Sequence, residues 1–326
     1  MPMVISRTPL RITFTGGGTD LPAYYREYGP GVVISAAIDK FITIIVNDKF
    51  DKRIRVSYSK TEIVEDPSQL NHELVREALK LVGIDGGIEI VSISDIPSEG
   101  TGLGSSSAFT VGLLNALHVW KGERPSPKQL AEEAIDIELN RVQSPVGKQD
   151  QYLAAFGGMQ YMSFEKDERV VTTPLLTNIN DAKQLRSYLM LFYTGRSRQA
   201  NPILKSQSTG VGSRIEAYRK MIGITEELRE VVLAKRWDEI GLLMHKNWEL
   251  KKTLSNGISD PQIDEWYRKA MSAGATGGKL IGAGGGGFLL MFSPPEAKDR
   301  IRVALKELEE KDFEIQMEGS HIHVPW

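Results

Sequence analysis

Glycine is concentrated in three short segments of this chain, and this restricts what the chain can fold around. The 326 residues include 31 glycines, and nearly half of them fall in the windows 16–18, 100–104 and 274–287. Glycine has no Cβ, so its backbone can adopt left-handed conformations and approach a ligand or another segment closely. The clustering predicts three loops that surround a ligand.

Charge and cysteine content exclude several classes of protein. The chain has 40 basic and 42 acidic residues, a net charge of −2, with 41% hydrophobic and 25% charged residues, as in an ordinary globular protein. Binding to nucleic acid or to an anionic membrane needs a basic excess, so we expect neither partner. Cysteine is absent, which excludes disulfides, thiolate nucleophiles and cysteine-ligated zinc and fits a reducing compartment.

No segment looks like a targeting or membrane segment. Residues 1–14 alternate apolar residues with Arg7 and Arg11 and lack the apolar core of a signal peptide. The apolar runs 41–46 and 288–292 are far shorter than the roughly 20 residues of a membrane helix. We therefore expect a cytoplasmic protein. The sequence leaves the oligomeric state open, with a homodimer as one option.

The hydrophobic pattern predicts an α+β protein with two domains, residues 1–175 and 176–326. Alternating apolar residues predict strands at 3–14, 41–58, 87–93 and 188–193. Three-to-four spacing, with Pro and Ser starts and a Gly83 stop, predicts helices at 66–83, 105–120, 126–141, 215–254, 260–273 and 297–311. The polar stretch 165–181 marks the boundary, and we expect the glycine loops to meet between the domains, where ligand clefts are common.

The segment 97–108 reads Pro-Ser-Glu-Gly-Thr-Gly-Leu-Gly-Ser-Ser-Ser-Ala and leads into an apolar helix. Free N–H groups and the helix dipole attract an anion to such a start, and three hydroxyls can bond its oxygens or a metal. The segment predicts a phosphate-binding loop. The alternative is an ordinary loop in which one serine caps the helix.

Other motifs lack the context that they require. No Gly-Lys-Ser or Gly-Lys-Thr ends a glycine loop, which excludes a Walker A motif. Residues 282–287 match Gly-x-Gly-x-x-Gly, but a strand-like segment follows where a nicotinamide-binding fold needs a helix. Hydrolase signatures are absent. His321 and His323 share a predicted strand edge, and without a third ligand a metal site there is disfavoured.

Asp150 is a candidate general base. It stands beside Lys148 at an otherwise uncharged helix start, and a carboxylate near cations stays ionised and can accept a proton from a substrate hydroxyl. The alternative is a helix-terminal aspartate that only interacts with the dipole.

Three segments together resemble the GHMP small-molecule kinase family. They are Pro9–Asp20 (PLRITFTGGGTD), Gly102–Ser107 (GLGSSS) and Lys279–Phe288 (KLIGAGGGGF), in the family's order. Within the family, Gly-Gly-Gly-Thr-Asp20 and Gly147–Tyr152 (GKQDQY) look like the D-glycero-D-manno-heptose 7-phosphate kinases. The resemblance implies an N-terminal domain like the second domain of ribosomal protein S5 and a ferredoxin-like C-terminal domain.

The resemblance also implies roles for individual residues, with ATP and Mg²⁺ as cofactors. Asp150 and Arg11 would be the catalytic pair, and Ser106 and Glu138 would contact the metal. The ATP phosphates would be bound by Gly102, Leu103, Gly104, Ser105, Ser106 and Ser107. Substrate would meet Gly18, Thr19 and Asp20, and the loop with Gly285 and Gly286 would close over the cleft.

The implied activity is phosphorylation of the anomeric hydroxyl of a sugar phosphate, giving a heptose 1,7-bisphosphate from heptose 7-phosphate. A 1-kinase for a galactose-like or fucose-like sugar is the alternative, and a catalytically silent sugar sensor could keep the same loops.

A phosphorylated substrate needs further cations in its pocket. Arg196 and Arg198 follow the predicted strand 188–193 on a short turn, and guanidinium groups suit phosphate oxygens. We expect Arg196 and Arg198, together with Lys148, to bind the substrate phosphate. The alternative is a solvated pair of surface arginines.

Overall fold

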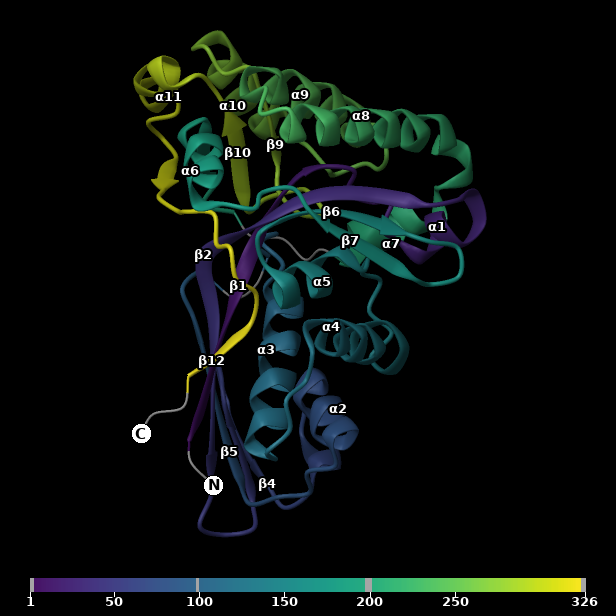
Figure 1. Ribbon diagram of the computed structural model, residues 1–326, viewed down its shortest axis with the longest axis vertical. Coiled ribbons are helices and arrows are strands. Elements are labelled where there is room, and N and C mark those ends of the chain that lie inside the picture. Colours follow the sequence, from purple (N-terminus) through teal and green to yellow (C-terminus); the bar gives the residue numbers. More distant parts are fainter. Residues whose placement is uncertain (1–2, 98–99, 197–200, 324–326) are drawn as a thin grey trace.

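The computed structural model describes residues 3–97, 100–196 and 201–323, which form two β-sheets connected and covered by helices (Figure 1). The first sheet has eight strands in the order β12-β1-β2-β5-β3-β4, with β6 paired to β2 and β7 paired to β6. Its strands are β1 (Val4–Thr15), β2 (Gly31–Asp48), β3 (Ile54–Ser57), β4 (Thr61–Val64), β5 (Ile88–Ser94), β6 (Met159–Phe164), β7 (Val170–Pro174) and β12 (His321–His323).

The long strand β2 holds this sheet together because it pairs with three strands. Residues 31–36 pair with β6, residues 42–48 pair with β5, and β1 follows β2 along its length. The first glycine segment comes directly after β1, and there the Gly16 N–H donates to Asn247 Oδ1, 3.1 Å away, in the second half of the chain. The end of β1 thus lies where the two halves meet.

Helices of the first half gather on one face of this sheet, with α3 against β1 and β2 (Figure 1). α3 is buried over residues 107–118, which explains why its apolar positions continue on all sides. The segments in this half are α1 (Pro22–Tyr28), a 3₁₀ turn (Pro67–Gln69), α2 (Glu73–Val82), α3 (Ser105–Trp120), α4 (Pro127–Ile135), a π-helical segment (Asp136–Arg141) and α5 (Gln149–Phe156).

The second half is built on a four-stranded antiparallel sheet in the order β11-β8-β10-β9. Its strands are β8 (Leu189–Tyr193), β9 (Gly277–Leu280), β10 (Phe288–Phe292) and β11 (Glu309–Lys311). Its helical segments are α6 (Ile179–Ser187), α7 (Asn201–Thr209), a 3₁₀ turn (Gly212–Arg214), α8 (Ile215–Leu233), α9 (Trp237–Lys252), α10 (Pro261–Ser272), a 3₁₀ turn (Pro295–Ala297) and α11 (Lys298–Ala304). α8 and α9 lie side by side and also contact the first sheet (Figure 1).

Most predicted elements are present, and the difference at the predicted helix 297–311 has a cause distant in sequence. The helix predicted at 105–120 matches α3, and Gly83 ends α2 in the left-handed conformation, as predicted. The helix predicted at 297–311 is wrong beyond Ala304, because residues 309–311 pair with the edge of β8 instead. A pairing partner distant in sequence leaves no trace in local periodicity.

The predicted division at residue 175 needs a correction at the end of the chain. Residues 321–323 form β12, which pairs with β1, and Ile315 forms a bridge with Ile38. The chain therefore leaves the second sheet and returns to the first, so a second domain running without interruption from 176 to 326 is wrong. Among the described residues, no helix is long and apolar enough to cross a membrane.

Candidate active site

A cavity of about 700 Å³ lies where the three glycine segments meet. Its lining comes from the loop after β1, the loop before α3, the segment before α5 and the loop between β9 and β10, with Arg11 and Lys251 among the side chains. The prediction that these loops come together is confirmed.

Two of the loops touch backbone to backbone. A Cβ added at Gly102 would lie 2.4 Å from the Ile281 carbonyl oxygen, and one added at Gly282 would lie 2.6 Å from the Gly102 Cα. Both glycines have positive φ angles, 76° and 84°. No other residue fits this contact without displacing backbone, which explains why glycines recur in both segments.

The N-terminus of α3 opens into the cavity without a side-chain cap. Its N-cap residue is Gly104, in the left-handed conformation, and within the described residues no side chain caps the first turn. Ser105 Oγ, which is buried, has no partner among the described residues, and all three serines line the cavity. The serine-capped alternative is therefore wrong, and the helix start presents N–H groups and hydroxyls that can bind an anion.

Glu138 lies behind this helix start on the π-helical segment 136–141, a distortion that often accompanies functional sites. Its carboxylate accepts hydrogen bonds from Ser106 Oγ (3.0 Å), Ser107 Oγ (2.8 Å), Thr110 Oγ1 (3.0 Å) and the Gln151 amide. Burial raises the pKa of Glu138, and these hydrogen bonds oppose the rise. Ser106 and Glu138, which the resemblance assigns to one metal, are therefore in direct hydrogen-bond contact.

The donor set at Ser106 and Glu138 fits Mg²⁺. This ion prefers hard oxygen ligands and is usually held by one or two carboxylates, waters and substrate phosphates. The described residues hold no group of three or more histidine or acidic side chains that could bind a metal alone, so a metal here would share its ligands with a phosphate. The same observation leaves His321 and His323 without a third ligand.

Asp150, on the first turn of α5, is held by Arg11 of β1 through two parallel hydrogen bonds. Arg11 Nε donates to Oδ1 and Nη2 donates to Oδ2, both at 2.7 Å, and Nη1 donates to the Gly102 carbonyl at 2.5 Å. Arg11 is buried and Asp150 lines the cavity. This bidentate geometry fixes the carboxylate beside the loop that precedes α3.

Asp20 forms the opposite wall. Its Oδ1 accepts the Gly18 N–H at 2.9 Å and its Oδ2 accepts Gln149 Nε2 at 3.1 Å. Burial raises the pKa of Asp20, Asp150 raises it further, and Lys251 lowers it. Two carboxylates, Asp20 and Asp150, therefore face one cavity together with Arg11 and Lys251.

Several residues expected to bind a ligand lie elsewhere. Thr19, expected at the substrate, is buried, and its hydroxyl donates to the Gly16 and Val32 carbonyls. Leu103, expected at the ATP phosphates, and Gly285, expected over the cleft, do not line the cavity. Arg196 forms an ion pair with Asp260 at 2.8 Å. Arg198 lies outside the described residues. Arg196 is thus the described arginine of the expected phosphate clamp, and it is paired with Asp260 instead.

Lys148 also points away from the cavity. Its Nζ donates to the Glu168 carbonyl at 3.0 Å and to Glu168 Oε2 at 2.5 Å, and it lies 5.0 Å from the centre of the Tyr25 ring. Lys148 is only 5% exposed. Its contacts join the start of α5 to the turn between β6 and β7 rather than forming a substrate contact.

Two lysines in the cavity, Lys251 and Lys279, were not singled out from the sequence. Lys279 is on β9, three residues before Gly282, and Lys251 is in the last turn of α9. The available signal was a lysine inside the otherwise apolar strand Gly277–Leu280. For Lys251 there was none, because lysine is common in the last turn of a helix.

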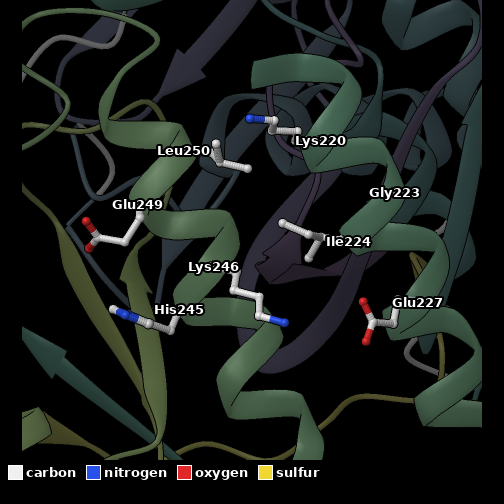
Figure 2. A pocket seen from close by; sticks show the side chains of 8 residues that line it. All are labelled: Lys220, Gly223, Ile224, Glu227, His245, Lys246, Glu249 and Leu250. Carbon is white, nitrogen blue, oxygen red and sulfur yellow. The ribbon is translucent and has the colours of Figure 1, made fainter. Parts of the chain in front are cut away.

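A second hollow, of about 560 Å³, lies between α8 and α9 (Figure 2). Charges of both signs line it, and His245 donates or accepts a hydrogen bond with the Tyr267 hydroxyl at 2.8 Å. No residue that the sequence singled out for function belongs to it. The candidate active site is therefore the cavity between the glycine loops.

Comparisons with known proteins identify the family of the chain. A family described as GHMP kinases N terminal domain matches residues 72–158, and one described as GHMP kinases C terminal matches residues 225–311. A D-glycero-alpha-D-manno-heptose 7-phosphate kinase of Campylobacter jejuni is 28% identical, with 98% of each chain covered. A bifunctional fucokinase/GDP-fucose pyrophosphorylase of Arabidopsis thaliana is 25% identical over 94% of this chain and 31% of its own length.

Among solved structures, a D-glycero-D-manno-heptose 1-phosphate kinase from Bacteroides thetaiotaomicron superimposes with a TM-score of 0.82. It is 25% identical, and the match covers 99% of both chains. The α+β fold, with an N-terminal and a C-terminal part, is thus confirmed at the level of the whole chain.

The placement of Lys148 generates a prediction about stability. Burial alone would raise the pKa of Glu168, but hydrogen bonds from Arg26, Lys148 and Tyr25 outweigh it and lower the pKa to about 2. The ionised carboxylate therefore stabilises the fold above the usual glutamate pKa of about 4.3, and this contribution is lost as pH falls toward 2.

We expect Glu168→Gln to lower the free energy of unfolding at pH 7 by up to about 1 kcal/mol, since the group is half exposed. The difference from the parent should shrink between pH 5 and pH 3 in urea titrations. Glu230→Gln, an exposed glutamate on α8, is the control and should change little at either pH. A pH-independent difference would contradict the assignment.

Proposed function

Because this chain belongs to the GHMP kinase family and is an ATP-dependent kinase, we propose that it phosphorylates the anomeric hydroxyl of a sugar phosphate. The proposed substrate is D-glycero-D-manno-heptose 7-phosphate and the product its 1,7-bisphosphate. One observation carries the proposal: Arg11 holds Asp150 in a cavity between an anion-binding helix start and a second carboxylate, Asp20.

The loop before α3 is the proposed site of the ATP phosphates. Phosphoryl transfer demands little covalent chemistry of a protein, which mainly positions the reactants and neutralises charge. The uncapped N–H groups of α3 and the serine hydroxyls supply donors to phosphate oxygens, and Gly102 and Gly104 allow the backbone to approach them. In this proposal the terminal phosphate of ATP faces Arg11 and Asp150.

Asp150 is the proposed general base. It accepts the proton of the anomeric hydroxyl as that oxygen forms a bond to the γ-phosphorus, while the bond from the γ-phosphorus to the bridging oxygen breaks and ADP leaves. Arg11 orients the Asp150 carboxylate through two hydrogen bonds, and its positive charge offsets the charge that spreads over the transferred phosphoryl group.

Ser106 and Glu138 are the proposed Mg²⁺ contacts. The ion, when bound, neutralises phosphate charge and orients the phosphates for in-line transfer. Asp20 and Gln149, which hydrogen-bond to each other, are the proposed contacts for the sugar hydroxyls, since a carboxylate and an amide together accept and donate.

A sugar without a phosphate is the second candidate substrate. The fucokinase relative is similar over 94% of this chain. It favours a fucose-like 6-deoxyhexose, phosphorylated at C1, as the alternative substrate. A silent sugar-binding protein is the third outcome to distinguish, and the bidentate Arg11–Asp150 pair beside the loop opposes it.

The function is tested by a coupled assay for ADP release with heptose 7-phosphate, unphosphorylated heptose, fucose and galactose. We expect the highest kcat/KM with heptose 7-phosphate, and phosphorus NMR should locate the new phosphate at C1. Preference for fucose or galactose would select the second candidate. Ligand binding without ADP release from any of the sugars would select the silent sensor.

Removal of the base should slow the chemical step. Asp150→Asn should lower kcat by about 100-fold or more, because the amide cannot take the proton, while ATP binding measured by calorimetry persists. Asp85→Asn, which makes the same change at an exposed aspartate outside the cavity, is the matched control and should keep kcat near the parent value. A kcat of Asp150→Asn close to that of the parent excludes Asp150 as the base.

Loss of a metal contact should change the metal dependence of the rate. Ser106→Ala should raise the Mg²⁺ concentration for half-maximal rate severalfold, because the ion loses a ligand. Ser126→Ala is the matched control: Ser126 Oγ accepts the Gln129 N–H and caps α4, so its loss should cost about 1 kcal/mol of stability and leave the Mg²⁺ titration unchanged. Superimposable titrations for the parent and Ser106→Ala would contradict the metal site.

A further inference from the structure

Two buried lysines face the cavity, and the proposed mechanism leaves both without a task. Lys251 ends α9 and is 4% exposed, and Lys279 lies on β9 and is 2% exposed. They come from different elements of the second half and line the same cavity as Asp20 and Arg11. A lysine is almost never buried to this extent unless a partner compensates its charge.

The partners that the protein supplies are incomplete. Lys251 Nζ donates to the Gly17 carbonyl at 2.7 Å and to Gln207 Oε1 at 3.2 Å, and both acceptors are neutral. Within the described residues, no group accepts a hydrogen bond from Lys279 Nζ or forms an ion pair with it. The Asp150 carboxylate is engaged by Arg11, which donates one hydrogen bond to each of its two oxygens.

The free cavity is therefore short of negative charge. Burial lowers the pKa of Lys251 to about 8, with Asp20 opposing and Arg11 adding to the shift. Burial lowers the pKa of Lys279 well below the usual lysine value, and repulsion from Lys251 and Arg11 adds to this effect. An anion between the two ammonium groups would replace repulsion by attraction.

We propose that Lys251 and Lys279 form the subsite for the phosphate that the sugar substrate already carries. The inference rests on the proposed function and assigns its phosphate to these lysines in place of Arg196, which is paired with Asp260. A phosphate offers three acceptor oxygens, enough for both ammonium groups at once.

The surroundings of Lys251 favour the substrate phosphate over the transferred one. A Cβ added at Gly18 would lie 3.3 Å from Lys251 Nζ, and one added at Gly17 would lie 3.9 Å from it. The ammonium group therefore lies against the loop that also carries Asp20. The transferred phosphoryl group instead has the helix start of α3 and Arg11. The cavity thus offers separate cations for two phosphates.

The kinetic test uses Lys251→Met and Lys279→Met, which remove the charge and keep the length of the side chain. Each should lower kcat/KM for heptose 7-phosphate at least about tenfold more than kcat/KM for unphosphorylated heptose, because a charge-assisted contact is lost only with the former. An equal loss with both sugars would overturn the proposal.

Lys298→Met is the matched control. Lys298 is also a partly buried lysine whose pKa burial lowers to about 8, but its Nζ donates to the Leu189 carbonyl outside the cavity. Its replacement should leave the preference for the phosphorylated sugar unchanged. A preference lost equally in Lys298→Met would show that removal of any such lysine has this effect, and would overturn the proposal.

A binding test separates this inference from the proposed activity. Inorganic phosphate is titrated into the parent protein saturated with a non-hydrolysable ATP analogue, which occupies the α3 loop. Calorimetry at pH 8 in buffers of different ionisation enthalpy should show proton uptake, because a bound anion raises lowered lysine pKa values. Lys251→Met and Lys279→Met should bind phosphate at least about tenfold more weakly.

Binding without proton uptake, or no binding to the parent, would overturn the subsite even if the enzyme phosphorylates heptose 7-phosphate. Proton-linked binding would support the subsite even if the preferred sugar is a different phosphate ester. The parent measurement needs no variant, so it decides the matter should either substitution prevent folding.

Discussion

The contact between the Gly102 and Gly282 backbones is the constraint on which the site depends, because it brings a loop of the first sheet against a loop of the second. Ile281 O lies where a Cβ of Gly102 would be. The same closeness directs the uncapped start of α3 toward the cavity and leaves the carbonyl of Gly102 free to accept from Arg11. A side chain at either glycine would separate the halves and widen the space in which reactants must be held.

Charge in the cavity is arranged in two groups. Arg11 and Asp150 neutralise each other through a geometry that fixes the carboxylate, whereas Lys251 and Lys279 share only Asp20 as an anionic neighbour. A kinase that accepts a phosphorylated sugar must accommodate two sets of phosphate charges without bringing them together. Two separated cation groups provide for this, and the low dielectric of a buried cavity strengthens both.

The two halves of the chain contribute different parts. The first half supplies the loop before α3 and the proposed catalytic pair, Arg11 of β1 and Asp150 of α5, and the second half supplies the buried lysines of α9 and β9. The final strand β12 returns to β1, so the second half is anchored to the first at both of its ends. Such anchoring suits a site whose residues come from both halves, since relative movement would disperse them.

The sequence by itself determined the local features: the glycine segments, the helix of residues 105–120, the Pro-initiated helices and the strand at 188–193 follow from periodicity and turn chemistry. The resemblance to a known family also implied that Asp150 and Arg11 belong to one site. Only the tertiary structure decided that residues 309–311 form a strand, that Lys148 turns to Glu168, and that Arg196 pairs with Asp260. Lys251 and Lys279, 28 positions apart on a helix and a strand, become neighbours of one cavity only when the halves pack. Local sequence encodes backbone preference and the polarity of a face, but the partner of a charged side chain is chosen by contacts between distant segments, which no local pattern records.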